Sequence, residues 1–234
     1  MITIAEAAKL AVVHTVHPRV LSLYLTVPAD PAGLCGLPAR ADDLIAAAES
    51  ACAGRWRVAD EERSLVRDRL ETSGRDWPGR TVAVFACADA GLSEAFPLPC
   101  RVPDLAVLGV RPHVRPLLAA MQRCPGHLAG QVAATPPGGL AATGLQACLA
   151  AVNAGAVQTL IVPEDGLVPG YECGRCGDLT VEPDECPDWG TAALPVPDVI
   201  DEMVSRTLED GGKVCLLHDG PSRIAARLRF AVAT

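Results

Sequence analysis

The order of apolar and polar residues in the first half of the chain predicts strands alternating with helices. Apolar runs bounded by Pro or Gly are typical of buried strands, and apolar residues three or four positions apart indicate amphipathic helices. Asp60 is placed as the N-cap of one helix and Gly74 as its C-terminal stop. We expect strands over residues 20–27, 81–87, 94–98 and 105–110, and helices over residues 3–14, 39–53, 60–73 and 114–121.

The second half has a different organisation. Residues 124–143 show no period and are dominated by Gly, Pro and Ala, which indicates a linker. Beyond it, Pro197 is placed at the first position of a helix that stops at Gly211. The patterns predict helices over residues 144–153 and 197–210, and strands over residues 157–162, 214–217 and 224–230.

Strands alternating with helices on both sides of a linker predict the α/β fold class, as two small α/β sandwich units. We expect an N-terminal domain over residues 1–123, a linker over 124–143 and a C-terminal domain over 144–234. Residues 171–190 interrupt the C-terminal domain as a cysteine-rich insertion.

Charge is unevenly divided along the chain. Residues 1–125 hold 14 basic and 14 acidic side chains, whereas residues 126–234 hold 6 and 14, which accounts for the net charge of −8. An acidic surface repels nucleic-acid phosphates, so the second half favours a protein partner over RNA. An arginine run in the first half is interpreted as a solvated helix face paired with nearby carboxylates, among them Asp60, Glu61, Glu62, Asp68 and Glu71.

The N-terminal residues have no basic and apolar pattern of a secretion signal, and no stretch has the length of a transmembrane helix. We therefore expect a cytoplasmic protein without a membrane partner, and with its ten cysteines reduced. The cysteines outside the insertion have no ligand spacing and are predicted mainly as small core residues.

The insertion carries most of a zinc motif. Cys173 and Cys176 are spaced as a zinc knuckle, and Cys186 begins a second knuckle whose other cysteine is replaced by Trp189. Structural zinc takes four ligands, so the fourth would be water, Asp188, His218 or a residue of a partner. The alternative is a loop that once held zinc and is now held by packing of Trp189. Zinc is the expected cofactor, and we predict no catalytic residues.

Four segments of the second half carry a family resemblance. They resemble the C-terminal domain of bacterial proteins related to the archaeal and eukaryotic peptide-chain release factors, a group that includes Pelota and Balon. In that domain a helix and a strand precede a small zinc-bearing excursion, and a long helix follows. The segments are residues 151–163, 173–177, 196–202 and 209–212. A looser resemblance in the first half covers residues 21–25, 82–86 and 112–118.

The chain departs from this family in one respect. Family members carry a middle domain, but the interval between Met121 and Gly144 is too short to hold one. The tripeptide Ala129-Gly130-Gln131 lies in this interval and is similar to the catalytic Gly-Gly-Gln of release factors, with alanine in place of the first glycine. Without a supporting domain it is interpreted as linker.

The resemblance implies a noncatalytic translation-associated factor that binds the ribosomal A site, elongation factor Tu, or both, in ribosome hibernation or rescue. Elongation factor Tu would meet the acidic C-terminal domain, and no sequence-specific DNA binding is expected. Two alternatives stay open. One is a small cysteine- or zinc-dependent hydrolase, because three thiolates and a water can activate that water. The other is a degenerate paralogue without activity.

Overall fold

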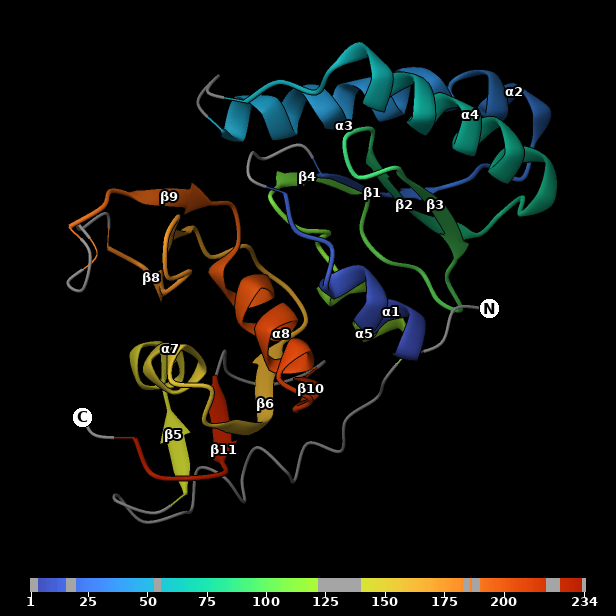
Figure 1. The fold of residues 1–234 in the computed structure, drawn as a ribbon. Helices are drawn as coiled ribbons and strands as arrows, with labels where there is room; N and C mark the ends of the chain where they lie inside the picture. The colour runs from blue at the N-terminus through green and yellow to red at the C-terminus, as the bar shows by residue number, and fades with distance from the viewer. Residues whose placement is uncertain are drawn as a thin grey trace. The chain divides into compact units, whose positions relative to one another are not determined.

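The computed structural model describes residues 4–15, 20–52, 56–121, 140–182, 186, 190–217 and 224–232. The chain divides into two compact units, Met1–Met121 and Gln122–Thr234, and each is considered by itself (Figure 1). Both units combine helices with a four-stranded sheet, and the second adds a three-stranded sheet. The predicted α/β fold class with a cysteine-rich insertion is confirmed. In the described parts of the chain, no helix is both long and apolar enough to cross a membrane.

The first unit is built on an antiparallel sheet of order β3-β2-β1-β4. At its centre, Leu23 lies opposite Val84 on one side and opposite Ala106 on the other. The predicted strands all appear, with ends shifted by at most two residues. They are β1 (Val20–Thr26), β2 (Thr81–Cys87), β3 (Leu92–Pro97) and β4 (Leu105–Gly109).

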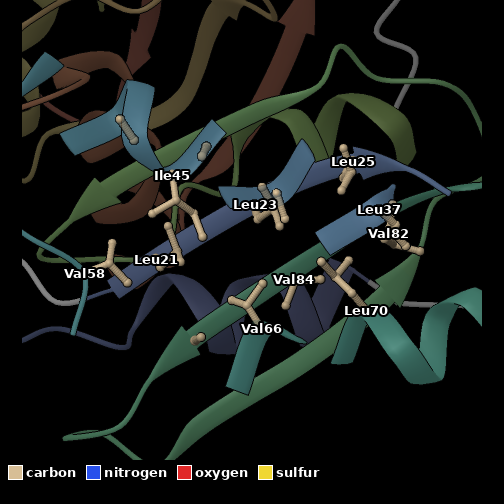
Figure 2. Packing of buried hydrophobic residues seen from close by; sticks show 14 of the residues in the cluster. Leu21, Leu23, Leu25, Leu37, Ile45, Val58, Val66, Leu70, Val82 and Val84 are labelled. Atoms are coloured by element: carbon tan, nitrogen blue, oxygen red, sulfur yellow. The ribbon is translucent and has the colours of Figure 1, made fainter. Parts of the chain in front are cut away.

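Helices cover both faces of this sheet. Helices α2 (Pro31–Cys35), α3 (Leu37–Ala51) and α4 (Asp60–Asp76) lie on one face, and α1 (Ile4–Ala11) and α5 (Arg115–Met121) lie on the other (Figure 1). Figure 2 shows Leu21, Leu23 and Leu25 of β1 in the core beneath α3 and α4. Tyr24 points to the opposite face, where its hydroxyl donates to the backbone oxygen of His113 at 2.5 Å. Burial on both faces is the reason why β1 reads as a nearly unbroken apolar run.

The ends of α4 differ from the prediction. Its N-cap is Ala59, Asp60 is the first helical residue, and the helix passes through Gly74 to Asp76. A Cβ at Gly74 would lie 3.3 Å from Leu34 Cδ2, so the glycine lets α4 approach α2 closely and does not end the helix.

Arginines of α4 are paired, as predicted, but largely with another helix. Arg63 reaches Glu49 at 2.8 Å and Arg67 reaches Asp42 at 3.1 Å, both on α3. Only the pair of Arg75 with Glu71, at 2.8 Å, follows the predicted spacing within one helix. Arg63 and Arg67 thus join α4 to α3, whereas the pair of Arg75 with Glu71 lies on a solvated face, as predicted.

The second unit has a main sheet of order β10-β6-β11-β5, in which β6 and β10 run parallel and the other pairs antiparallel. Helices α7 (Leu145–Asn153) and α8 (Val199–Glu209) contact each other and form a layer on this sheet. Strand β5, which pairs with β11, lies at the end of the segment that was assigned to the linker. The strands are β5 (Ala141–Thr143), β6 (Val157–Pro163), β10 (Lys213–Leu217) and β11 (Ala225–Leu228).

The start of α8 also corrects the sequence analysis. The helix begins at Val199, two residues after Pro197, and its N-cap is Asp198. One carboxylate oxygen of Asp198 accepts from the backbone N–H of Ile200 at 3.2 Å and from that of Val168 at 3.2 Å. The second contact ties the start of α8 to the segment that leads into the insertion.

The insertion forms the third sheet, of order β8-β7-β9. Its strands are β7 (Gly170–Cys173), β8 (Leu179–Thr180) and β9 (Ala193–Val196). We call residues 170–196 the cysteine excursion. Strand β8 contacts both α7 and α8, so the excursion packs on the side of the helices away from the main sheet (Figure 1).

Candidate metal centre

The three predicted ligands come together in the cysteine excursion. The sulfurs of Cys173, Cys176 and Cys186 all lie within 4.8 Å of one another, and those of Cys176 and Cys186 are 3.5 Å apart. Cys173 and Cys186 are buried, whereas Cys176 is exposed. Two residues of the cluster are thus buried and one is exposed.

The first two cysteines lie on a tight turn that begins at the end of β7. The backbone N–H of Gly177 donates to the oxygen of Cys173 at 2.8 Å, and the N–H of Cys173 donates to the oxygen of Asp178 at 2.8 Å. Gly177 has a φ of +82°, a conformation that costs glycine little and other residues much more. This turn places Cys176 beside Cys173.

The described backbone of the second turn repeats the first. The N–H of Gly190 donates to the oxygen of Cys186 at 2.7 Å, the N–H of Cys186 donates to the oxygen of Thr191 at 3.0 Å, and φ of Gly190 is +59°. In this repeat, position 189 is the counterpart of Cys176. Trp189 therefore stands at the position where the matching turn carries a ligand.

The surroundings of the thiols in the cluster give them different pKa values. The hydroxyl of Thr191, 3.3 Å from the sulfur of Cys173, lowers the pKa of Cys173 to about 6, and bonds from the turn add to this effect. Loss of water around the sulfur of Cys176 raises its pKa to about 12, although the residue as a whole is exposed. Hydrogen bonds to the other two sulfurs add to the rise. The thiol of Cys173 is therefore more acidic than that of Cys176.

The cluster fits a zinc ion at three corners of a tetrahedron. Zinc–sulfur bonds of about 2.3 Å imply sulfur–sulfur distances of about 3.8 Å. The separation of 3.5 Å between Cys176 and Cys186, and the limit of 4.8 Å for the trio, lie close to that requirement. Thiolates also select soft or borderline metals such as zinc over magnesium or calcium.

The fourth corner of the tetrahedron would need one more ligand. Among the described residues, no further Cys, His, Asp or Glu atom joins this trio. The candidates from the sequence, Asp188 and His218, lie outside the described residues, as does Trp189.

The excursion is fixed to the helices by polar contacts that sequence reasoning missed. The Asn153 side chain at the end of α7 donates to the backbone oxygen of Leu179 at 2.9 Å and accepts from its N–H at 3.0 Å. Glu172, next to Cys173 on β7, pairs with Arg206 of α8 at 3.0 Å. The Glu172 and Arg206 side chains are only 9% and 15% exposed. The local sequence pattern does not predict these contacts, because both join residues 26 or more positions apart.

Replacing Arg206 with Met is expected to loosen the first cysteine turn. A Cβ built at Gly177 would lie 2.8 Å from an Arg206 guanidinium nitrogen, so this side chain supports the turn directly. Methionine keeps the apolar stem and removes the charge, and breaking the pair should lower the free energy of unfolding by roughly 2–3 kcal/mol, less than for a wholly buried pair. Urea unfolding measures this change. Arg75→Met, which removes an exposed pair, should change it by less than about 0.5 kcal/mol; equal losses would contradict the supporting role of Arg206.

The remaining cysteines agree only in part with the prediction of small core residues. Cys87 and Cys148 are buried, and burial raises the pKa of both thiols, that of Cys148 to about 12. Cys35 and Cys100 are exposed. Cys215 on β10 is disulfide-bonded, which differs from the expectation that all thiols are reduced.

Comparison with known proteins does not assign the chain to a family. No family model matches it, and no curated protein matches it. One similar solved structure is the C-terminal domain of a peptide chain release factor from Methanosarcina mazei, with 22% identity, 40% of this chain and 73% of that chain covered, and a TM-score of 0.27. Another is described as an archaeal protein, with 13% identity, 100% and 99% covered, and a TM-score of 0.31. TM-scores below 0.5 carry no argument about function. The fold and site define a two-unit α/β protein with a cysteine cluster that fits a metal ion.

Proposed function

We propose that the chain is a noncatalytic, translation-associated binding protein. One observation carries this proposal, namely the order of elements in the second unit. Helix α7 and strand β6 are followed by the cysteine excursion and then by α8. That is the order which the sequence resemblance implies for the C-terminal domain of the release-factor relatives.

The partners in this proposal are the ribosome, at its A site, and elongation factor Tu, in hibernation or rescue. The charge division supports a protein partner for the second unit, which has 14 acidic and 6 basic residues after position 125. In this proposal residues 124–143 replace the middle domain of the family and link domains over 1–123 and 144–234, and the protein works in the cytoplasm without sequence-specific DNA binding. The cysteine excursion is then a structural module that shapes the surface beside α8.

Co-sedimentation with ribosomes and capture on immobilised elongation factor Tu test the proposal. We expect association at about 50 mM salt that weakens toward about 200 mM, because contacts with charged surfaces are screened. Replacing the exposed Glu182 and Glu209 of the second unit with Lys should reduce capture by elongation factor Tu about tenfold.

The matched control changes charge equally in the first unit. Glu61→Lys with Asp68→Lys alters two exposed residues of α4 and should leave capture by elongation factor Tu unchanged. Absence of association with both ribosomes and elongation factor Tu at low salt would overturn the proposal and favour a degenerate paralogue.

A second candidate is the cysteine- or zinc-dependent hydrolase. The lowered pKa of Cys173 favours it, because a thiolate beside a metal ion or a water is a chemically reactive group. Turnover of an activated ester that zinc stimulates and a chelator abolishes would support the hydrolase. Lack of turnover at any zinc concentration would remove it.

A further inference from the structure

Two sulfurs of the cysteine cluster are placed for reaction with each other. The sulfurs of Cys176 and Cys186 are 3.5 Å apart, within the 4.8 Å that encloses the whole trio. Cys176 is an exposed residue, whereas Cys186 is buried. An accessible thiol beside a second one is the arrangement of oxidation-sensitive cysteine pairs.

The third sulfur, that of Cys173, also hydrogen-bonds with Cys176, but it has a further partner outside the trio. Cys173 lies 3.3 Å from the hydroxyl of Thr191, and its backbone is held at both N–H and oxygen by the first turn. It is also buried at the end of β7, whereas the neighbouring Gly174 and Arg175 are exposed. These contacts favour Cys186 over Cys173 as the partner of Cys176.

We infer that Cys176 and Cys186 are a modification site, at which peroxide forms a reversible disulfide within the excursion when no metal is bound. This site is independent of the proposed role in translation. In the first step the thiol of Cys176 gives up its proton, its sulfur attacks one peroxide oxygen, the O–O bond breaks, and a sulfenic acid and one water, which takes up the proton, form. In the second step the sulfur of Cys186 attacks the sulfenic sulfur and displaces its hydroxyl group as a second water. Two thiols lose two electrons in total, hydrogen peroxide accepts them, and the thiol protons leave in the water.

Oxidation and metal binding exclude each other at this site. A disulfide leaves only Cys173 of the three thiols that fit zinc, so the oxidised excursion cannot hold the ion through this cluster. Conversely, a sulfur that is bonded to zinc is protected from peroxide. The cluster therefore has a metal-bound reduced state and a metal-free oxidised state.

Peptide mapping of the full-length protein tests the inference. Protein stripped of metal by a chelator is treated with hydrogen peroxide, its remaining thiols are alkylated, and it is digested without reductant. Besides the link that Cys215 already makes, we expect one new linked peptide pair that joins Cys176 to Cys186 within one chain and disappears after reduction. Prior addition of zinc should lower the yield of this pair roughly tenfold.

Variants separate this pair from general oxidation. Cys186→Ser should abolish the linked peptide and leave Cys176 to form sulfinic acid, whereas Cys35→Ser, which changes an exposed cysteine of α2, should leave the link intact. Peptide mapping of the unmodified protein still tests the inference even if the Cys186→Ser variant fails to fold. A link from Cys176 to Cys173 or to a second chain would overturn the inference, as would sulfinic acid on Cys176 of the unmodified protein or an absence of reaction.

Discussion

Replacing Trp189 with Cys is expected to bring bound zinc to one ion per chain and to raise the melting temperature by roughly 10 °C in the presence of zinc. Position 189 is the counterpart of Cys176 in the repeated turn, whose backbone bonds at Cys186 and Gly190 are already formed. A fourth thiolate closes the coordination sphere, and affinity for the folded state adds directly to stability. A zinc concentration a hundredfold above the dissociation constant contributes about 2.7 kcal/mol, which is several degrees or more for a unit of this size.

Metal analysis and thermal unfolding with and without zinc measure this effect. The unmodified protein should contain less than one zinc per chain. Trp189→Ser is the matched control, because it removes the indole without supplying a ligand, and its melting temperature should not respond to zinc more than that of the unmodified protein. One zinc per chain in the unmodified protein would show that a fourth ligand is present and would contradict the expectation that Trp189 leaves the site one ligand short.

Replacing Cys173 with Ser is expected to abolish zinc binding and to detach the cysteine excursion. Only two sulfurs of the cluster would remain, so affinity should fall on the order of a hundredfold or more. Cys173 is also the buried residue that meets Thr191, and it lies next to Glu172, whose pair with Arg206 fixes β7 to α8. Loss of the metal should therefore increase local opening of residues 170–196.

Competition with a chromophoric chelator measures the affinity, and hydrogen exchange measures the opening. Cys52→Ser, a change in the first unit, should leave both unchanged. If Cys173→Ser kept the zinc affinity of the unmodified protein, the trio would not be the metal site. If affinity fell but exchange in the excursion did not rise, then β7 and its polar contacts hold the excursion without metal.

Local pattern determined the elements whose burial or turns leave a mark in the sequence itself. The buried strands β1 and β2 were predicted from apolar runs, because a strand covered on both faces has little room for polar side chains. The helix α7 was predicted over residues 144–153, and it ends shortly before Gly155, whose φ of +64° suits glycine. The three cysteines were predicted from their spacing, since a tight turn is encoded within a few residues.

Only the tertiary structure decided features that depend on distant partners. Strand β5 has three residues and no pattern of its own, and it exists because β11 supplies its hydrogen bonds. Gly74 was predicted to end α4, but the helix continues to Asp76, because the packing of α4 on β2 and β3, with Ser73 fully buried, outweighs the weak helix propensity of glycine.

The candidate site also combines features that the sequence predicts with features that only the tertiary structure decides. Its three cysteines are visible in the sequence, because the spacing that indicates a zinc knuckle is short. The 3.5 Å approach of Cys176 to Cys186, the contact of Thr191 with Cys173 and the Glu172–Arg206 pair are not visible. Each depends on how the two turns and α8 pack together, and such contacts are set by the whole unit and not by the residues on either side.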